Sequence, residues 1–394
     1  MHETKKIRYL PYLIIFHEIA VYLSNDMYLP SMPAIAKTLR LTQDQTQSTL
    51  TLWFLGASAL QFILGPISDR YGRKIVIIFG GVCYVIASAV CATATTLPWL
   101  LLARFVQGTA VCSVLVAGYA AIHELFGTKE AIKILSIMAA ITILAPAFGP
   151  LVGALLIQFY SWRYLFWLLF VLGIMSTTLL FLFMPESNKV KHNINPATIS
   201  KDYFNIVTNL NFILPTLGYC LLFAIYYFWM FEAPFLMIDI YGRSPLYYGL
   251  SQALIFSGFF FGAELIRRLL EKYSLKIIIR YGAVIALLLC VILTVAAKLF
   301  DSMPFSVLCL MGISMATSVL FGPLNRLAIE ACTTQPMGRI TAVFSTIVGL
   351  FGAFCGWLLM LIQVESLIAI SLLISICMLS ALALIFFTKV PILE

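Results

Sequence analysis

The sequence contains very little charge. Only 11% of its 394 residues are Asp, Glu, Lys or Arg, whereas 62% are hydrophobic. Soluble domains carry about 25% charged and about 45–50% apolar residues, so the composition excludes a soluble globular protein. The apolar character continues from one end of the chain to the other, which also excludes a soluble domain with a single anchor. The composition predicts a membrane protein with many spans.

Motifs for enzymatic chemistry are missing as well. The sequence has no HExxH, GxSxG or Walker loop, which argues against a metalloprotease, a serine hydrolase or an ATP-driven pump. The nine cysteines are scattered singly and form no CxxC pair, so they predict neither a disulfide framework nor a metal site. We expect no enzyme activity, no cofactor and no metal.

Long apolar runs dominate what is present. A helix needs roughly 20 mostly apolar residues to cross a bilayer, and about twelve such stretches can be counted. The longest polar interruption divides them into two groups of six. We therefore predict an all-α membrane protein with a six-helix bundle over 1–183, a cytoplasmic linker over 184–209 and a second six-helix bundle over 210–394. The predicted spans are 9–32, 49–67, 74–93, 98–122, 132–157, 162–183, 210–238, 246–269, 275–298, 303–328, 337–361 and 366–388.

The basic residues predict the orientation. With the N-terminus inside, nineteen of the 25 Lys and Arg residues lie at cytoplasmic ends, five lie outside, and Arg104 lies within a span. Cytoplasmic loops of membrane proteins carry such an excess of Lys and Arg. We expect both termini in the cytoplasm and insertion into a bacterial inner membrane. The net charge of +8 is explained by this topology and predicts no nucleic-acid partner.

The two halves also resemble each other weakly. The stretch "GPISDRYGRK" follows the second span, and the acidic-then-basic "AELIRRLLEKYSLK" follows the eighth. "APAFGPLVG" in the fifth span has a loose counterpart in "STIVGLFGAFCG" in the eleventh. Two related six-helix halves are the architecture of many secondary transporters.

Four stretches carry a more specific resemblance. "GPISDRYGRK" (65–74) resembles the loop between helices 2 and 3 of the major facilitator superfamily, and "ARFVQG" (103–108) resembles its helix 4 motif. "APAFGPLVG" (145–153) is similar to the helix 5 motif of its proton-coupled antiporters, and "SNDMYLPSMP" (24–33) to the helix 1 motif of its twelve-span drug:proton antiporters. Taken together, the four stretches resemble those of the bicyclomycin-resistance and MdfA-like multidrug exporters. The resemblance implies a monomeric antiporter of small molecules and protons in the lipid bilayer.

The resemblance also implies roles for two sets of residues. In the superfamily the acid of the helix 2–3 loop caps a helix end and pairs with basic groups, which locks one state of the transporter. Glu124 is a plausible partner for Arg73, although a simple topology signal stays open for Arg70. The helix 5 motif seals the two halves and limits proton leak, with ordinary helix packing as the alternative. The gating loop thus comprises Gly65, Asp69, Arg70, Gly72, Arg73 and Glu124, and the antiporter motif Gly149, Pro150 and Gly153.

Two acids and one arginine lie within predicted spans, where ionisable residues are rare and usually functional. Asp26 and Arg104 both lie roughly 10 Å from the outer surface by helical rise, so we expect them to pair and Arg104 to keep Asp26 ionised. Glu18 lies about 12 Å deeper, without a cation in its own span. It is expected to gain and lose a proton near physiological pH. We predict that Glu18 and Asp26 bind protons and cargo in turn. A structural hydrogen bond, for Glu18 with His17, is the alternative.

A drug-binding chamber should be apolar and aromatic with few polar groups. The carboxylates Glu18 and Asp26 are also candidates for binding cationic cargo. Glu232 in the seventh span departs from the pattern of the exporters that this chain resembles, and it either lines the cavity or lies in water at the outer interface. Which aromatic residues face inward is left open. The other candidates are Tyr22, Asn25, Tyr28, Trp53, Gln107, Tyr119, Tyr226, Tyr227 and Trp229.

Three other functions are weighed against multidrug export. A dedicated exporter of an endogenous metabolite, siderophore or polyamine would have the same fold. An uptake symporter is disfavoured by the antiporter-like helix 5 motif. A membrane-embedded enzyme or sensor is disfavoured because the polar groups in the spans form no nucleophile–base set.

Overall fold

The computed structural model describes residues 2–188, 196–332, 335–362, 364 and 366–387. Every regular element in this part of the chain is helical, as the sequence predicts. The chain divides into two compact units, residues 1–199 and 200–394. The division lies inside the segment that the sequence predicts as a linker. That segment includes helix α10 (Pro196–Val207), and its residues 189–195 lie outside the described part.

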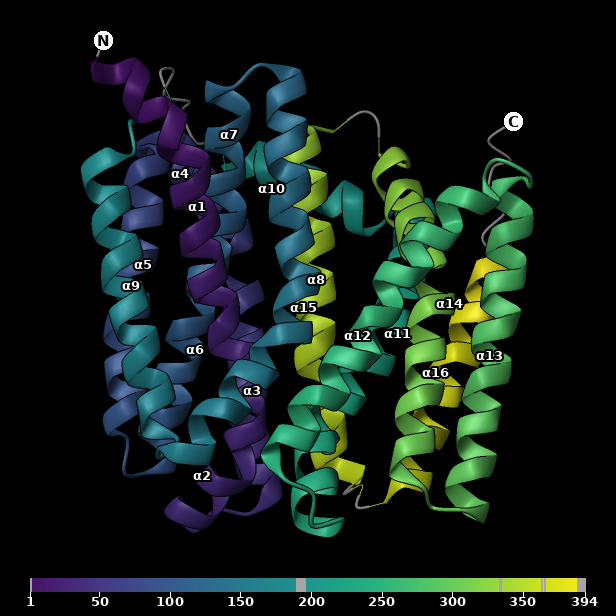
Figure 1. The fold of residues 1–394 in the computed structure, drawn as a ribbon. Coiled ribbons are helices and arrows are strands. Elements are labelled where there is room, and N and C mark those ends of the chain that lie inside the picture. Colours follow the sequence, from purple (N-terminus) through teal and green to yellow (C-terminus); the bar gives the residue numbers. More distant parts are fainter. Residues whose placement is uncertain (1, 189–195, 333–334, 363, 365, 388–394) are drawn as a thin grey trace. The chain divides into compact units, whose positions relative to one another are not determined.

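The first unit is a bundle of long helices that run alongside one another (Figure 1). Within it, α1 packs against α8 and α9, α5 packs against α6 and α9, and α3 packs against α6. The elements of this unit are α1 (His2–Asp26), η1 (Leu29–Ser31), α2 (Met32–Leu39), α3 (Gln43–Ala59), α4 (Gln61–Tyr71), α5 (Arg73–Thr93), α6 (Leu97–Ser113), η2 (Val114–Gly118), α7 (Tyr119–Leu125), α8 (Thr128–Phe159) and α9 (Arg163–Phe183).

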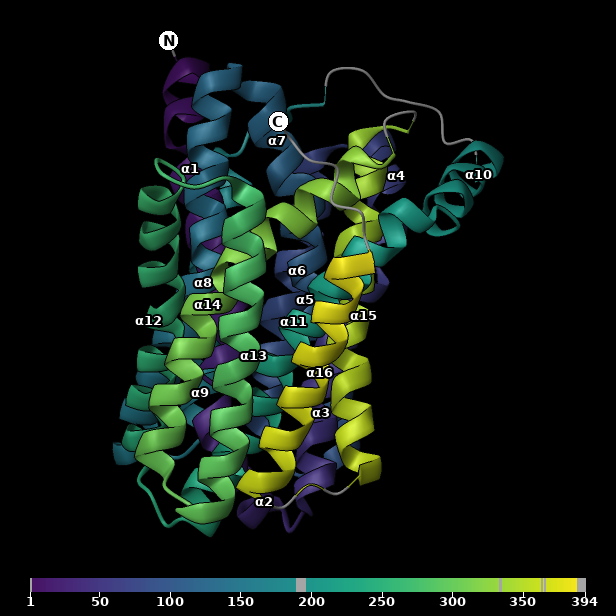
Figure 2. The ribbon, with the colours of Figure 1, turned by 90° about the vertical axis from the view of Figure 1, so that its right-hand side faces the viewer.

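The second unit repeats this pattern of packing. Helix α11 packs against α15 and α16, α13 against α14 and α16, and α12 against α14, so each pairing has its counterpart in the first unit. Figure 2 shows α13, α14 and α16 side by side. The elements of this unit are α11 (Leu210–Phe235), η3 (Leu236–Ile240), α12 (Pro245–Leu269), α13 (Leu275–Leu299), α14 (Met303–Glu330), α15 (Met337–Ile362) and α16 (Leu367–Phe387).

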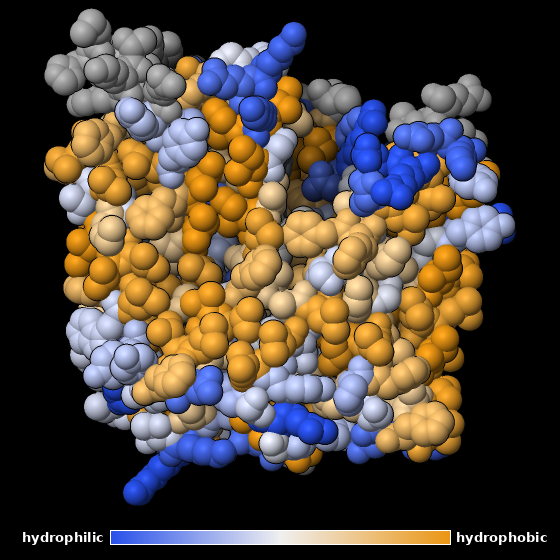
Figure 3. Space-filling view, in the orientation of Figure 1, coloured by the Kyte–Doolittle hydropathy of each residue, from blue (hydrophilic) through white to orange (hydrophobic). Residues whose placement is uncertain are grey.

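Twelve helical segments among the described residues fall on the twelve predicted spans. In the same part of the chain, nine helices are long and apolar enough to cross a membrane, or eleven if two bent pairs are counted. Helix α1, which carries Glu18 and Asp26, occupies the first predicted span. Figure 3 shows hydrophobic side chains over the middle of the visible helices and hydrophilic ones toward their ends. The chain is a multi-pass membrane protein.

Two predicted spans are bent rather than straight. The second span breaks between α3 and α4 with a bend of 42°. The fifth span, α8, bends by 43° between Ile141 and Leu144, near Pro146. A proline lacks the N–H that would bond to the carbonyl four residues earlier, and its ring pushes that carbonyl away. The bend lies shortly before Gly149 and Gly153, the two glycines of the antiporter motif.

Candidate functional site: carboxylates on α1

Glu18 is completely buried within the first unit. The hydroxyl of Tyr119 donates a hydrogen bond to its Oε1 over 3.2 Å. Its Oε2 has no hydrogen-bond partner among the described residues. The neighbouring His17 uses Nδ1 to bond Ser176 Oγ at 3.0 Å, so the alternative in which Glu18 pairs with His17 is not seen. One carboxylate oxygen of Glu18 is thus left for a proton or a ligand.

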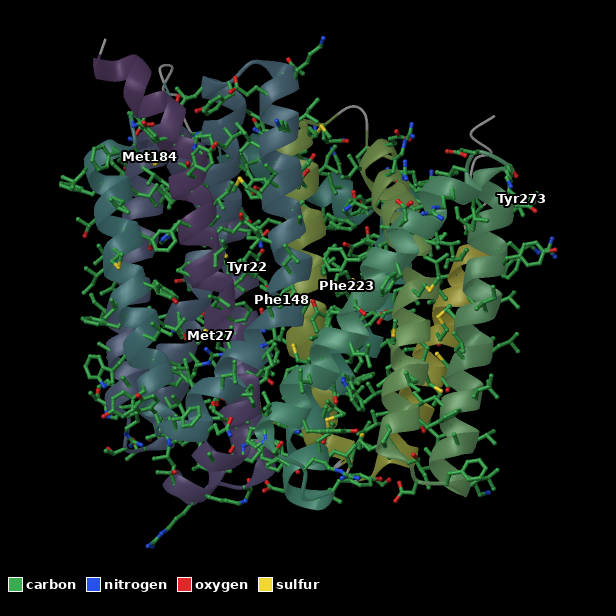
Figure 4. The ribbon with its side chains drawn as sticks, in the orientation of Figure 1. Tyr22, Met27, Phe148, Met184, Phe223 and Tyr273 are labelled. Atoms are coloured by element: carbon green, nitrogen blue, oxygen red, sulfur yellow. The ribbon has the colours of Figure 1, made fainter. Side chains whose placement is uncertain are left out.

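Asp26 is the last residue of α1 and is 2% exposed. The side-chain amide of Asn25 donates to its Oδ1 over 3.0 Å. Helix α8 lies directly against it, because a Cβ added at Gly149 would come within 2.5 Å of the Asp26 Cβ. One turn further along α8, a Cβ at Gly153 would collide with the carbonyl oxygen of Met27. Both glycines of the antiporter motif therefore pack on the segment of α1 that holds Asp26. Figure 4 labels Met27 at this end of α1.

The predicted ion pair between Asp26 and Arg104 is not formed among the described residues. The guanidinium of Arg104 donates through Nη1 to the carbonyl of Ser24 at 2.8 Å and to Gln107 Oε1 at 2.7 Å. It also lies 4.3 Å from the centre of the Tyr28 ring. Arg104 is completely buried. Arg104 therefore fixes the backbone of α1 two residues before Asp26 instead of contacting the carboxylate.

Three predicted cavity residues surround Arg104. The hydroxyls of Tyr28 and Thr49 lie 2.5 Å apart, Trp53 donates to Ser24 Oγ over 3.1 Å, and the amide of Gln107 donates to Ser88 Oγ over 3.0 Å. All three predicted residues are buried, so they hold α1, α3, α5 and α6 together around the arginine. Of the other first-half candidates, Tyr22 and Tyr119 are half-buried and Asn25 is buried.

The remaining candidates lie on α11 in the second unit. Tyr226, Tyr227, Trp229 and Glu232 are all buried there, and the hydroxyl of Tyr226 lies 2.5 Å from Thr317 Oγ1 on α14. The structure places Tyr226 in a cluster of aromatic rings whose other members sequence reasoning missed. Its ring centroids lie 4.7–6.4 Å from those of neighbouring members, and it comprises Tyr219, Phe223, Tyr226, Phe256, Phe259 and Phe321. Figure 4 labels Phe223 on α11.

The gating loop lies where α4 ends and α5 begins. Arg73 contacts Asp69 at 2.6 Å and Glu124, at the end of α7, at 2.8 Å. The predicted pairing of Arg73 with Glu124 is confirmed. Gly72 has a φ of +112°, a conformation that residues with a side chain rarely adopt. Arg70 lies over the ring of Tyr71 at 5.4 Å. The remaining predicted member, Gly65, lies within α4 and has open space around it.

Sequence reasoning missed a further acid in this loop. Glu186, three residues after the end of α9, accepts the backbone N–H groups of Arg73 and Lys74 at 2.8 and 3.1 Å. A carboxylate at this place satisfies free N–H groups of the α5 N-terminus and opposes the positive end of its dipole. The next residues reinforce the contact, because Ser187 donates to Glu124 at 2.6 Å and Asn188 donates to the Asp69 carbonyl at 2.7 Å. The start of the predicted linker is therefore attached to the gating loop.

Removing this cap gives a testable result. Replacing Glu186 with alanine leaves two N–H groups of α5 unbonded, and loss of an N-cap costs about 0.5–2 kcal/mol. We expect Glu186→Ala to lower the thermal midpoint of the detergent-solubilised protein by several degrees. Glu130→Ala is the control, since Glu130 is exposed in the first turn of α8. Equal midpoints for both variants would show that the cap does not stabilise the loop.

No group of three His, Cys, Asp or Glu side chains placed to hold a metal ion occurs in the described part of the chain. The polar groups brought together on α1 are carboxylates, amides and hydroxyls. Such groups can bind protons, cations and hydrogen-bonding ligands directly.

Comparison with known proteins relates these features to a family. A sequence profile described as Major Facilitator Superfamily matches residues 14–356. Multidrug transporter MdfA of Yersinia pestis is 32% identical over 274 residues, which are 69% of this chain and 67% of MdfA. Multidrug resistance protein MdtM of Salmonella typhimurium and chloramphenicol resistance protein CraA of Acinetobacter baumannii are each 30% identical over 266 residues, or 67% of this chain. The aligned part spans 64% of the length of MdtM and of CraA.

Solved structures show the same fold at low sequence identity. A bacterial homologue of the human lysosomal transporter Spinster, inward-facing and occupied, superposes with a TM-score of 0.72 at 16% identity, covering 97% of this chain and 96% of that one. The human organic anion transporter MFSD10 gives a TM-score of 0.67 at 16% identity, covering 96% of this chain and 99% of that one.

Proposed function

Because the chain belongs to the major facilitator superfamily, we propose that it is a proton-coupled secondary transporter that exports lipophilic and often cationic drugs from the cytoplasm by alternating access. The observation that carries the proposal is Glu18, a buried carboxylate on α1 with one oxygen unbonded among the described residues. Such a group can hold either a proton or a cation, but it does not favour both at once. Proton binding would then release the cargo, and proton loss would prepare the site for the next molecule.

The other members of the site have distinct tasks in this scheme. Asp26 is the second exchangeable carboxylate, and Arg104 is a positioning residue that holds the α1 backbone beside it. Within the second unit, the aromatic rings of α11, α12 and α14 form an apolar cluster, which we propose to contact lipophilic cargo. Aromatic faces attract cations by about 0.5–2 kcal/mol.

The names of the relatives support export of several different drugs rather than export of one endogenous metabolite. MdfA and MdtM are named for multidrug transport or resistance, and CraA for resistance to chloramphenicol. We further propose that the protein works as a monomer in a bacterial inner membrane with both termini in the cytoplasm. The excess of Lys and Arg at one set of helix ends supports this orientation.

Transport by purified protein tests the proposal. Proteoliposomes with an imposed pH gradient should accumulate a lipophilic cation against its concentration gradient and lose that ability when the gradient is collapsed. Movement of the cation with the proton gradient, as in a symporter, or no response to the gradient would contradict the proposal. A screen across cationic, neutral and anionic compounds at two pH values would define the range of cargo.

The role of Glu18 gives a sharper prediction. Glutamine keeps the size of the side chain and can still accept the hydrogen bond from Tyr119, but it carries no negative charge. We expect Glu18→Gln to lower the transport of cationic cargo at least tenfold while transport of neutral cargo changes less than twofold. The measurement is initial uptake of one cation and one neutral compound in the same vesicles. Equal loss of both would assign Glu18 a structural role.

A further inference from the structure

An apolar groove lies in the second unit, well apart in sequence from the carboxylates on α1. It has a volume of about 620 Å³ and is lined by residues of α12, α13 and α14 and of the turn between α12 and α13. Its walls include Leu265 on α12 and Ile277, Tyr281 and Ile285 on α13, and Ala316 on α14 lies in its floor. Nothing in the proposed exchange mechanism uses this groove.

The packing of three helices explains why the groove exists. Both α12 and α13 pack against α14. Helix α12 lies so close to α14 that a Cβ at Gly258 or Gly262 would collide with the α14 backbone. Helix α13 crosses α14 next to small residues. A Cβ added at Gly282 would lie 3.3 Å from the carbonyl oxygen of Ala316. The groove lies between α12 and α13, where Gly312, Met315, Ala316 and Val319 of α14 line it.

The walls of the groove are exposed although they are apolar. Leu265, Ile277 and Ile285 are 37%, 44% and 49% exposed, and Tyr273 and Tyr281 are 52% and 63% exposed. Helices α12 and α13 both meet the length and hydropathy of membrane spans. In a bilayer such a surface contacts acyl chains, and tyrosines at its end are typical of the level of the lipid headgroups.

One end of the groove is positively charged. Arg267 and Arg268 lie in the last turn of α12, Lys272 lies in the turn that follows, and Arg280 lies on α13. Glu264 pairs with both Arg267 and Arg268, and Glu271 is exposed beside Lys272. Among the side chains that the structure describes, four cations and two carboxylates thus lie at this end.

Among the described side chains, Lys272 is the unpaired cation next to a residue that lines the groove, Tyr273, whereas Arg280 lies on the opposite face of α13 from the groove-lining residues. Both are exposed, and neither takes part in an ion pair among the described residues. The guanidinium of Arg280 lies 6.0 Å from the centre of the Phe386 ring. Figure 4 labels Tyr273, which lines the groove, close to the start of α13, and Figure 3 shows strongly hydrophilic residues above hydrophobic ones in this region.

We propose that the groove binds an anionic phospholipid, with an acyl chain between α12 and α13 and the phosphate next to Lys272 and Tyr273. Charge complementarity selects an anionic headgroup, because basic clusters at the end of membrane helices attract anionic lipids. The exposed apolar walls select a lipid chain from the bilayer over a soluble ligand. This inference does not depend on the proposed transport function, since the site lies wholly within the second unit.

Lipid titration of the purified full-length protein tests the headgroup. Native mass spectrometry with phosphatidylglycerol and with phosphatidylethanolamine should show at least fivefold tighter binding of the anionic lipid. The variant K272Q should remove this preference. K298Q is the matched control, because Lys298 is an exposed cation in the last turn of α13, at the far end of that helix from Lys272. Equal binding of the two lipids, or equal loss in K298Q, would overturn the proposal.

A second pair of variants tests the groove itself. Ile285→Trp should fill the space between α12 and α13 and weaken phosphatidylglycerol binding at least fivefold. Ile292→Trp adds the same bulk about two turns further along α13, at a residue that is 45% exposed and does not line the groove. Elution as a single species shows that each variant is folded. If both variants bind lipid like the wild type, the lipid is not held in the groove.

Discussion

Replacing Asp26 with asparagine is expected to abolish proton-driven transport. The substitution keeps the shape of a side chain that is 2% exposed and that packs against Gly149 of α8, but it removes the group that gains and loses the proton. Burial in hydrocarbon makes an ionised carboxylate costly, so a carboxylate at this place is expected to change its protonation with its surroundings. We expect at least a hundredfold loss of uptake driven by a pH gradient in proteoliposomes.

The matched control for this variant is Asp44→Asn. Asp44 lies in the first turn of α3 and is half-buried there. Asp44→Asn should transport within about twofold of the wild-type rate, because an acid in the first turn stabilises its helix by only about 0.3–1 kcal/mol. Proton-driven uptake by Asp26→Asn at the wild-type rate would remove Asp26 from the mechanism.

A single methyl group at Gly153 is expected to have the second largest effect. Its Cβ would collide with the carbonyl oxygen of Met27, a backbone atom that cannot rotate away. Overpacking of this kind typically costs about 1–3 kcal/mol. The least costly relief is a shift of α8 away from α1, which would open the contact beside Asp26. We expect Gly153→Ala to lower transport at least tenfold, measured in the same proteoliposome assay.

The control separates coupling from simple packing. Gly322 lies within α14 and has open space around its Cβ position, so Gly322→Ala should retain full transport. If Gly153→Ala expresses poorly but each inserted molecule transports at the wild-type rate, the motif serves helix packing alone. A folded Gly153→Ala protein with an uncoupled proton leak would support the sealing role implied by the family resemblance.

The course of the chain through the membrane was predictable, because apolar length alone limits where a helix can span. The bends were not predicted. Proline allows a kink in α8 at Pro146, but it does not give the angle, which depends on packing. The break between α3 and α4 at Leu60 follows no local signal that the sequence analysis used.

The error about Arg104 has a clear physical origin. Helical rise gives the depth of a residue in the membrane, and it correctly placed Arg104 near the end of α1. Depth does not give the direction in which a side chain points. The guanidinium donates through Nη1 to the Ser24 carbonyl and to Gln107, whereas its Nε and Nη2 have no hydrogen-bond partner in the described part of the chain. Every residue has a backbone carbonyl, so the sequence does not identify the one that accepts a hydrogen bond from Arg104.

Two other features depend on contacts that are remote in sequence. Glu186 caps α5 from 113 positions away, and no local capping pattern precedes α5 to indicate it. The rings of Tyr226, Phe256 and Phe321 come from three different helices. In spans that are apolar on all sides, periodicity does not distinguish an aromatic residue that faces the bundle from one that faces lipid.

The most direct test of the central claim is proton release on cargo binding. Purified protein in weakly buffered detergent solution near neutral pH is mixed with a lipophilic phosphonium cation, and a pH indicator reports the released protons. We predict release of about one proton per bound cation, reduced strongly in Glu18→Gln or Asp26→Asn. Binding of the cation without proton release by the wild-type protein would contradict exchange at these carboxylates.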